Sequence, residues 1–115
     1  MSIWLTPPVE DEPVITLVRW RIFRRENGKA HFVGYYPEGF EGRVSSAIEW
    51  FDPITRTGMT LSGRGYQLSG WPGFDAAAMY VWELWSKARG WENCVDVTDD
   101  VMAGVLAVDW KPSDA

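Results

Sequence analysis

Residues able to carry acid–base or nucleophilic chemistry are few in this 115-residue sequence, which holds one histidine, His31, and one cysteine, Cys94. A zinc site normally takes three or four ligands of these types, so two such residues far apart in the chain predict no metal centre. An unpaired cysteine beside an apolar residue, here Val95, usually serves as a small packing residue. We therefore interpret Cys94 as packing, and nothing in the sequence ties His31 to a nucleophile.

Carboxylates form two groups that deserve a chemical interpretation. Asp96, Asp99 and Asp100 lie close together but lack the spacing and the closing glutamate of a calcium loop, so we interpret them as charges at the start of a helix. Glu49 and Asp52 match the carboxylate pair of a glycosidase in residue type alone, and the sequence indicates no substrate groove beside them. No serine stands in the G-x-S-x-G elbow of hydrolases. We predict a protein that is not an enzyme and takes no cofactor and no metal.

The glycine-rich stretch SGRGYQLSGWPGFD, at 62–75, raises the question of a phosphate loop. A dinucleotide loop needs G-x-G-x-x-G followed at once by a helix, but Gly63 and Gly65 are followed by Leu68 where the third glycine belongs. No glycine precedes a Lys-Ser or Lys-Thr pair. The stretch instead predicts a tight hairpin between short strands at 58–62 and 65–70, and then the entry to a helix.

Asn27-Gly28 is the strongest hairpin signal, because both residues tolerate the positive φ of a two-residue type I′ turn between two strand-forming runs. Such a turn sets the pairs Arg24–His31, Phe23–Phe32, Ile22–Val33 and Trp20–Tyr35. Alternation then predicts a core face that holds Val18, Trp20, Ile22, Val33 and Tyr35. The opposite face holds Leu17, Arg19, Arg21, Phe23, Arg25, Phe32 and Tyr36.

This second face mixes arginines with aromatic rings and supplies the candidate partner-binding residues. They are Arg19, Arg21, Phe23, Arg25, Phe32 and Tyr36. Three interpretations stay open: a second small core beneath a terminal segment, a protein interface, or a sheet that stacks the bases of a single-stranded nucleic acid. The glycine–aromatic consensus of RNA-binding strands is absent from the sequence.

One long helix is expected at about 75–89, with Asp75 as its N-cap and Gly90 as the left-handed residue after its end. Trp91 is then placed to fold back onto Trp85. The expected apolar stripe of this helix comprises Ala77, Ala78, Val81, Trp82, Trp85 and Ala88.

We predict an α+β fold: an antiparallel sheet of about five strands, the helix at about 75–89 packed on one face, and a short C-terminal element. A half-buried strand is expected at 43–51, and a short strand followed by a helix that starts near Thr98. Residues 100–110 fit a helix or a strand. The side chains expected to be deeply buried are Trp20, Ile22, Val33, Ile48, Trp50, Val81, Trp82 and Trp85.

Length and composition indicate a single domain, 1–115, with an extended acidic and proline-containing lead-in at 1–13 and a flexible tail at 109–115. The net charge is −5, but residues 14–74 carry more bases than acids. The single cysteine, the lack of a signal-peptide pattern and the lack of a membrane-length apolar run predict a cytoplasmic protein that does not enter a membrane.

The run LSGRGYQLSGWPGFDAAAMYVWELW resembles a pattern in small uncharacterised bacterial and phage accessory proteins, a Ser-Gly hairpin followed by a Tyr-Val-Trp helix. The resemblance carries no catalytic motif and implies a fold element without an activity. In its overall profile, a small acidic single domain, the chain is similar to toxin-immunity proteins and to phage-encoded inhibitors of bacterial defence.

These observations predict a non-catalytic protein that binds another macromolecule, as a small acidic inhibitor of the immunity or counter-defence type that blocks a partner surface. The alternative is a sheet that binds single-stranded nucleic acid through its arginine and aromatic side chains. A protein partner is expected, a nucleic acid is the second choice, and a homodimer through the arginine face stays open.

Overall fold

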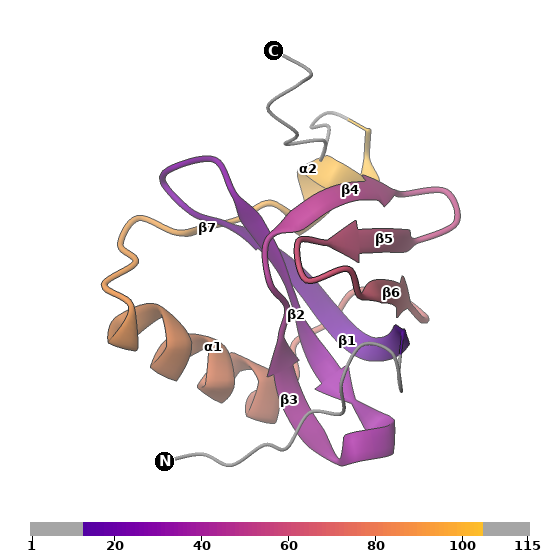
Figure 1. Cartoon of the computed structure of the whole chain (residues 1–115), viewed down its shortest axis with the longest axis horizontal. Coiled ribbons are helices and arrows are strands. Elements are labelled where there is room, and N and C mark those ends of the chain that lie inside the picture. The colour runs from indigo at the N-terminus through magenta and orange to yellow at the C-terminus, as the bar shows by residue number, and fades with distance from the viewer. Residues whose placement is uncertain (1–12, 105–115) are drawn as a thin grey trace.

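The computed structural model describes residues 13–104, which form an α+β fold with a mixed sheet and one main helix (Figure 1). The strands are β1 (Val14–Arg24), β2 (Ala30–Tyr36), β3 (Glu41–Val44), β4 (Ile48–Asp52), β5 (Thr57–Thr60), β6 (Gly65–Leu68) and β7 (Val95–Asp96). The helices are α1 (Ala76–Ala88), α2 (Thr98–Met102) and a single 3-10 turn, η1 (Pro37–Gly39). Residues 1–12 of the lead-in expected at 1–13, the tail expected at 109–115 and residues 105–110 lie outside the described residues.

The sheet runs in the order β3-β2-β1-β6-β5-β4, with β7 paired to β1 beyond the end of β6. The expectation of an antiparallel sheet of about five strands is therefore only roughly right, because β1 and β6 pair in parallel. β3 and β4 run in the same direction, since the chain between them continues rather than reverses: Ser45 N–H donates to the Phe32 carbonyl, and Leu61 N–H donates to the Ala47 carbonyl. The remaining connections reverse the chain, so β6 returns beside β1 with the same direction.

The first hairpin turns at the expected place but in a different register. Its loop is one residue longer than a type I′ turn: Arg25 N–H donates to the Lys29 carbonyl at 2.7 Å, and only Gly28, with φ +91°, takes a positive φ. The pairs are therefore Arg24–Ala30, Phe23–His31, Ile22–Phe32 and Arg21–Val33. The predicted register is wrong by one residue, and such a slip moves every side chain of β2 to the other face.

A second irregularity changes the faces of β1. The register shifts again between Val18 and Arg21, and Arg19 has a φ of +46°, so the strand contains a bulge. An extra residue in a strand resets its alternation. Leu17 and Trp20 consequently belong to the same buried cluster, whereas simple alternation placed them on opposite faces.

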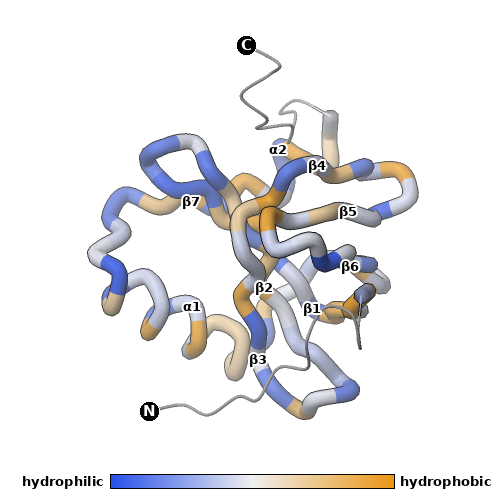
Figure 2. Tube along the Cα trace, viewed as in Figure 1, coloured by the Kyte–Doolittle hydropathy of each residue, from blue (hydrophilic) through white to orange (hydrophobic). Residues whose placement is uncertain are grey.

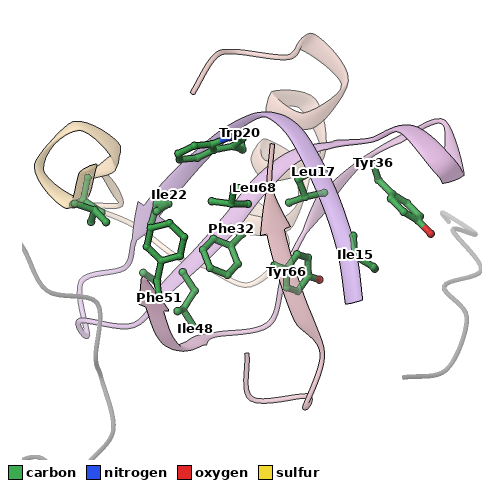
Figure 3. Packing of buried hydrophobic residues seen from close by; sticks show 13 residues of the cluster. Ile15, Leu17, Trp20, Ile22, Phe32, Tyr36, Ile48, Phe51, Tyr66 and Leu68 are labelled. Atoms are coloured by element: carbon green, nitrogen blue, oxygen red, sulfur yellow. The ribbon is translucent and has the colours of Figure 1, made fainter. Parts of the chain in front are cut away.

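The main core lies inside the curled sheet (Figure 3). Trp20, Phe32, Leu68 and Ile15 are fully buried there. Gly58 allows the Phe32 ring to pack directly on the backbone of β5. A Cβ at this position would lie only 2.6 Å from the ring. The six expected core residues that are buried are Trp20, Ile22, Val33, Ile48, Val81 and Trp82.

Two tryptophans expected in the core are not deeply buried. Trp50 is 38% exposed, because the β4–β5 register shifts between Ile48 and Trp50 and brings Phe51 into the core in its place. Trp85 is only partly buried and packs at the border of a second apolar cluster. The prediction of deep burial is wrong for both side chains.

Helix α1 begins and ends as its local sequence predicts. Asp75 caps it by accepting the Ala78 N–H at Oδ2, 3.0 Å away. At the other end Gly90 has a φ of +68°, and Trp91 N–H donates to the Ser86 carbonyl at 2.9 Å, which is the pattern of a Schellman cap. Figure 2 shows hydrophobic and hydrophilic residues alternating along this helix.

The helix packs on β2 and β3 and forms the second cluster, which contains Val33, Val44, Ala78, Val81 and Trp82. Gly42 makes this close approach feasible, since a Cβ there would lie 2.5 Å from the Ala77 backbone. Ala77 and Ala88 themselves are exposed, so the buried stripe is narrower than predicted.

Candidate binding surfaces

The six candidate partner-binding residues do not share one exposed face. Phe32 is fully buried and Tyr36 is 5% exposed, both in the main core. The one-residue difference in hairpin register turns these two side chains inward, away from Arg21 and Phe23. The prediction of a common face is wrong for Phe32 and Tyr36.

Arg21 is held under two neighbours. Its Nε donates to Asp96 Oδ2 at 2.9 Å, and its guanidinium carbon lies 4.2 Å from the centre of the Phe74 ring. Only 11% of the Arg21 side chain is exposed. β7 and the loop between β6 and α1 therefore cover this part of the arginine face together.

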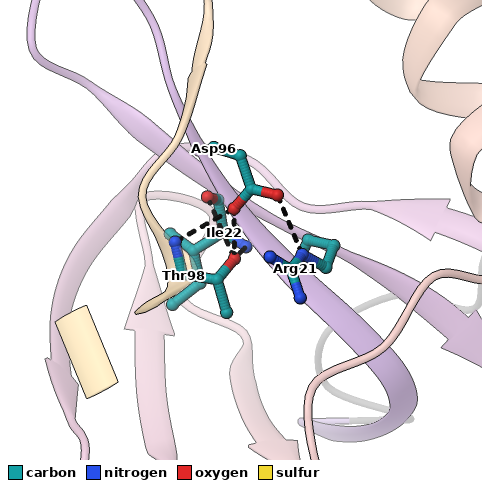
Figure 4. A network of polar contacts seen from close by, with 4 residues as sticks. All are labelled: Arg21, Ile22, Asp96 and Thr98. Atoms are coloured by element: carbon teal, nitrogen blue, oxygen red, sulfur yellow. Dashed lines mark hydrogen bonds and ion pairs between the residues drawn. The ribbon is translucent and has the colours of Figure 1, made fainter. Parts of the chain in front are cut away.

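Asp96 also joins Arg21 to a buried threonine (Figure 4). Asp96 Oδ1 accepts the Thr98 N–H at 3.0 Å and the Thr98 hydroxyl at 2.6 Å. The Thr98 hydroxyl in turn accepts the Ile22 N–H at 2.8 Å. Thr98 is thus the first residue of α2, as expected, but its side chain bonds to β1 rather than capping the helix.

Phe23, near the end of β1, and Arg25, just after it, are covered by helix α1 and the loop that follows the helix. The Phe23 ring stacks on Trp82, with centroids 4.9 Å apart and planes 11° apart. The Arg25 guanidinium lies 4.0 Å from the centre of the Trp91 ring. Of the six candidates only Arg19 is exposed, with 52% of its side chain accessible.

Beside Arg19 lies an exposed aromatic surface that the sequence analysis missed. Trp71 is 84% exposed and Phe74 is 66% exposed, in the loop between β6 and α1. Arg19 lies over the Tyr35 ring at 5.0 Å. We name Arg19, Tyr35, Trp71 and Phe74 the aromatic-loop surface. The segment WPGF at 71–74 could have indicated this surface, because two large aromatic side chains flank a Pro-Gly turn, but from the sequence alone we interpret the segment only as a turn.

The aromatic loop is attached to β1 at the bulge. Gly73 N–H donates to the Trp20 carbonyl at 3.2 Å, and Arg19 Nε donates to Asp75 Oδ1 at 3.0 Å. Asp75 thus caps helix α1 and fixes Arg19 at the same time. These bonds hold the loop that carries Trp71 and Phe74 in a defined position.

A second cluster lies at the end of the first hairpin and of α1. The His31 and Trp91 rings stack with centroids 4.8 Å apart, and Trp91 meets Trp85 edge-on at 6.5 Å. Arg89 lies 3.8 Å from the centre of the Trp85 ring. We name Arg25, His31, Trp85, Arg89 and Trp91 the arginine–indole cluster.

His31 is buried within this cluster at 3% exposure. Its Nδ1 lies 2.8 Å from the Ser45 carbonyl, which only accepts, so Nδ1 carries the proton. Burial lowers the pKa of His31; the bond to Ser45 opposes this, and the charges of Arg25, Arg89 and Lys29 lower it further. Among the described residues, the other ring nitrogen, Nε2, has no hydrogen-bond partner.

The other residues considered for chemistry, Cys94 and Asp52, make contacts that serve packing and turn geometry. Burial raises the pKa of Cys94, which packs against the second cluster, so its thiol stays protonated at neutral pH. Asp52 Oδ1 accepts the Ile54 N–H at 2.9 Å and shapes the turn after β4. Across residues 13–104, no group of three or more His, Cys, Asp or Glu side chains is arranged to hold a metal ion.

The described part of the chain defines an α+β protein with a curled mixed sheet, one main helix and two arginine–aromatic surfaces. Comparisons with protein families, with curated proteins and with solved structures found no match. Over the same residues, no helix is both long and apolar enough to cross a membrane.

Proposed function

We propose that this protein is a non-catalytic binding protein that occupies the surface of a protein partner through its aromatic-loop surface. A small inhibitor of the immunity or counter-defence type acts in this way, by covering a surface that its target needs. The single observation that carries the proposal is the exposure of Trp71, at 84%, and Phe74, at 66%, on a loop bonded to the bulge of β1.

Large exposed aromatic side chains beside an arginine are typical of the residues that dominate protein interfaces. Burying a large aromatic side chain removes about 150–250 Å² from water, which makes each ring a strong anchor. Order in the loop adds to this, because a preformed surface loses less conformational entropy on binding. The bonds from Gly73 to Trp20 and from Arg19 to Asp75 supply that order.

The alternative, a sheet that stacks nucleic-acid bases, finds less support. Phe32 and Tyr36 lie in the main core, and Phe23 stacks on Trp82. A stacking platform needs aromatic faces open to solvent. The sheet therefore offers no such platform from these three rings.

The proposal is tested by capturing partners from the native host with the full chain, followed by mass spectrometry. The wild type is compared with Trp71→Ala/Phe74→Ala and with Ile54→Ala, a matched control that removes an 88% exposed apolar side chain elsewhere. We expect a partner that the wild type and the control retain and the double variant loses by at least about tenfold in affinity. Equal retention by all three proteins would remove the aromatic-loop surface from the proposal.

A further inference from the structure

Helix α1 is apolar on the side that faces away from the sheet as well as on the side that packs against it. Of its 13 residues, AAAMYVWELWSKA, only Glu83, Ser86 and Lys87 are polar apart from the tyrosine hydroxyl. The inner side packs on β2 and β3, and Figure 1 shows the helix at the outside of the molecule. On the outer side Tyr80 is 61% exposed and Leu84 is 45% exposed. A helix that is apolar all round is typically covered on both sides, which points to a partner for the outer one.

The two charged side chains of α1 lie on this outer side, one turn apart. Glu83 and Lys87 are both exposed, and so is Leu84 beside them. A glutamate four residues before a lysine has the spacing that favours an ion pair within a helix. Even so, neither side chain forms an ion pair with any other residue of 13–104. The outer face therefore offers one negative and one positive charge to a partner, and the two charges cancel.

We propose that the outer face of α1 packs against the same face of a second copy of this chain, with the two helices antiparallel. The two-fold axis then passes the helix midway between Glu83 and Lys87. Glu83 of each copy lies opposite Lys87 of the other copy, so a single contact contains two reciprocal ion pairs. A parallel pairing would instead place each charge opposite its own copy, and like charges that face each other across an interface oppose association.

Antiparallel packing about this point also brings the exposed apolar side chains together. Leu84 lies next to the axis and meets Leu84 of the second copy between the two ion pairs. Tyr80 lies as far before the axis as Gly90 lies after it, so the tyrosine ring comes opposite Gly90 of the second copy. A Cβ at Gly90 would meet nothing within 4 Å, so this place is open to the ring. The same few residues supply both halves of every contact, which is the property of an isologous interface.

The size of this contact sets the affinity that we expect. The paired stretch runs from Tyr80 to Gly90, which is about 15 Å of helix. Stable dimers bury about 800 Å² on each partner, and one helix face of this length supplies less. We therefore expect a reversible dimer with a dissociation constant of about 10–100 µM. The interface lies outside the aromatic-loop surface and does not rest on the function proposed for that surface.

Exchanging the two charges tests the pairing directly. The full wild-type chain is compared by sedimentation equilibrium with Glu83→Lys, with Lys87→Glu and with the double variant, at about 5–500 µM. Each single variant places like charges opposite each other and should weaken self-association by at least about tenfold. The double variant restores opposite signs and should dimerise within about threefold of the wild type. An equimolar mixture of the two single variants should also dimerise, because one outer face is then positive and the other negative.

The apolar centre is tested by Leu84→Ala, with Ile54→Ala as its matched control. Ile54 is 88% exposed in the turn after β4, outside the proposed contact. Leu84→Ala should weaken the dimer by about tenfold, whereas Ile54→Ala should change its dissociation constant by less than about twofold. The substituted side chains are all exposed, so we expect each variant to keep the wild-type circular-dichroism spectrum.

Three results would overturn the proposal: a wild type that is monomeric at about 500 µM, a double charge variant no better than the single ones, or an equal effect of Leu84→Ala and Ile54→Ala. If the wild type is monomeric and Leu84→Ala lowers its stability in urea, the chain covers its own outer face. A dimer that survives both single charge variants would use another surface. None of these outcomes involves Trp71 or Phe74, so they leave the test of the aromatic-loop surface independent.

Discussion

The arginines of β1 and of the turn that follows it fall into two regions with different partners. Near the bulge, Arg19 pairs with Asp75 at 3.0 Å and Arg21 pairs with Asp96 at 2.9 Å. At the hairpin end, Arg25 lies over Trp91, and Arg89 comes to the same place from the end of α1. One region meets carboxylates and the other meets indole rings.

This difference decides what each region can still do. A guanidinium that donates to a carboxylate has fewer N–H groups left for another partner. Here the Arg19 bond links the N-cap of α1 to β1, and the Arg21 bond links β7 to β1. A guanidinium on an indole is held by its face and keeps the N–H groups at its edge. The exposed Arg19–Asp75 ion pair is worth only about 0–1 kcal/mol, whereas the Arg21–Asp96 pair is mostly buried, so removing one of its partners costs more.

The largest expected effect comes from removing Trp82, the ring on which the stacked region is built. Trp82 is 8% exposed and meets Phe23, His31 and Trp91 at centroid distances of 4.9, 6.1 and 5.9 Å. Trp82→Ala should lower the free energy of unfolding by about 3–5 kcal/mol, measured by urea denaturation. The same substitution at Trp71, which is 84% exposed, should change it by less than about 0.5 kcal/mol. Similar losses in both variants would contradict this view of the cluster.

A smaller effect is expected in the paired region from Asp96→Ala. The change removes the partner of Arg21, whose side chain is 11% exposed, together with two bonds to Thr98. A loss of about 2–3 kcal/mol in the free energy of unfolding follows, since a mostly buried cation is left unpaired. Asp99→Ala, in the first turn of α2 and exposed, serves as the control and should cost only a few tenths of a kcal/mol. Equal costs would mean that Asp96 acts only as a helix-start charge.

The smallest effect is a pH dependence of stability in the stacked region. The pKa of His31 in the folded protein lies below its ordinary value of 6.5, so the unfolded chain binds more protons as the pH falls through that value. Stability should be full above about pH 6.5 and decline below it, with a slope of at most about 1.4 kcal/mol per pH unit for one proton. Urea denaturation between pH 5.5 and 7.5 measures this slope. His31→Gln should remove it, and parallel profiles for the two proteins would rule His31 out as its source.

Elements governed by near neighbours in the chain were predictable. The cap at Asp75, the left-handed Gly90 and the return of Trp91 onto Trp85 follow from side chains within a turn or two of one another. Helix ends depend on such local bonds, so their residue types indicate their positions.

Strand faces were less predictable because successive side chains of a strand alternate between its two faces. The hairpin loop holds one residue more than the Asn27-Gly28 pair suggests, and bulges interrupt β1 near Arg19 and β4 near Trp50. Each single-residue change exchanges the buried and exposed sets beyond it. For this reason Phe32 and Tyr36 are buried instead of lying on the predicted binding face, and Trp50 lies outside the predicted core.

The amino-acid sequence by itself determined the class of fold, the position of the first hairpin and the limits of the main helix, because short-range bonds and periodicity act within a few residues. Only the tertiary structure decided which arginines meet carboxylates and which meet tryptophans. Asp75, Asp96 and Trp91 lie far along the chain from the arginines that they contact in and just after β1, and the curled sheet and its docked helix bring them together. Long-range pairing of this kind depends on register, bulges and packing at once, and no local pattern encodes it.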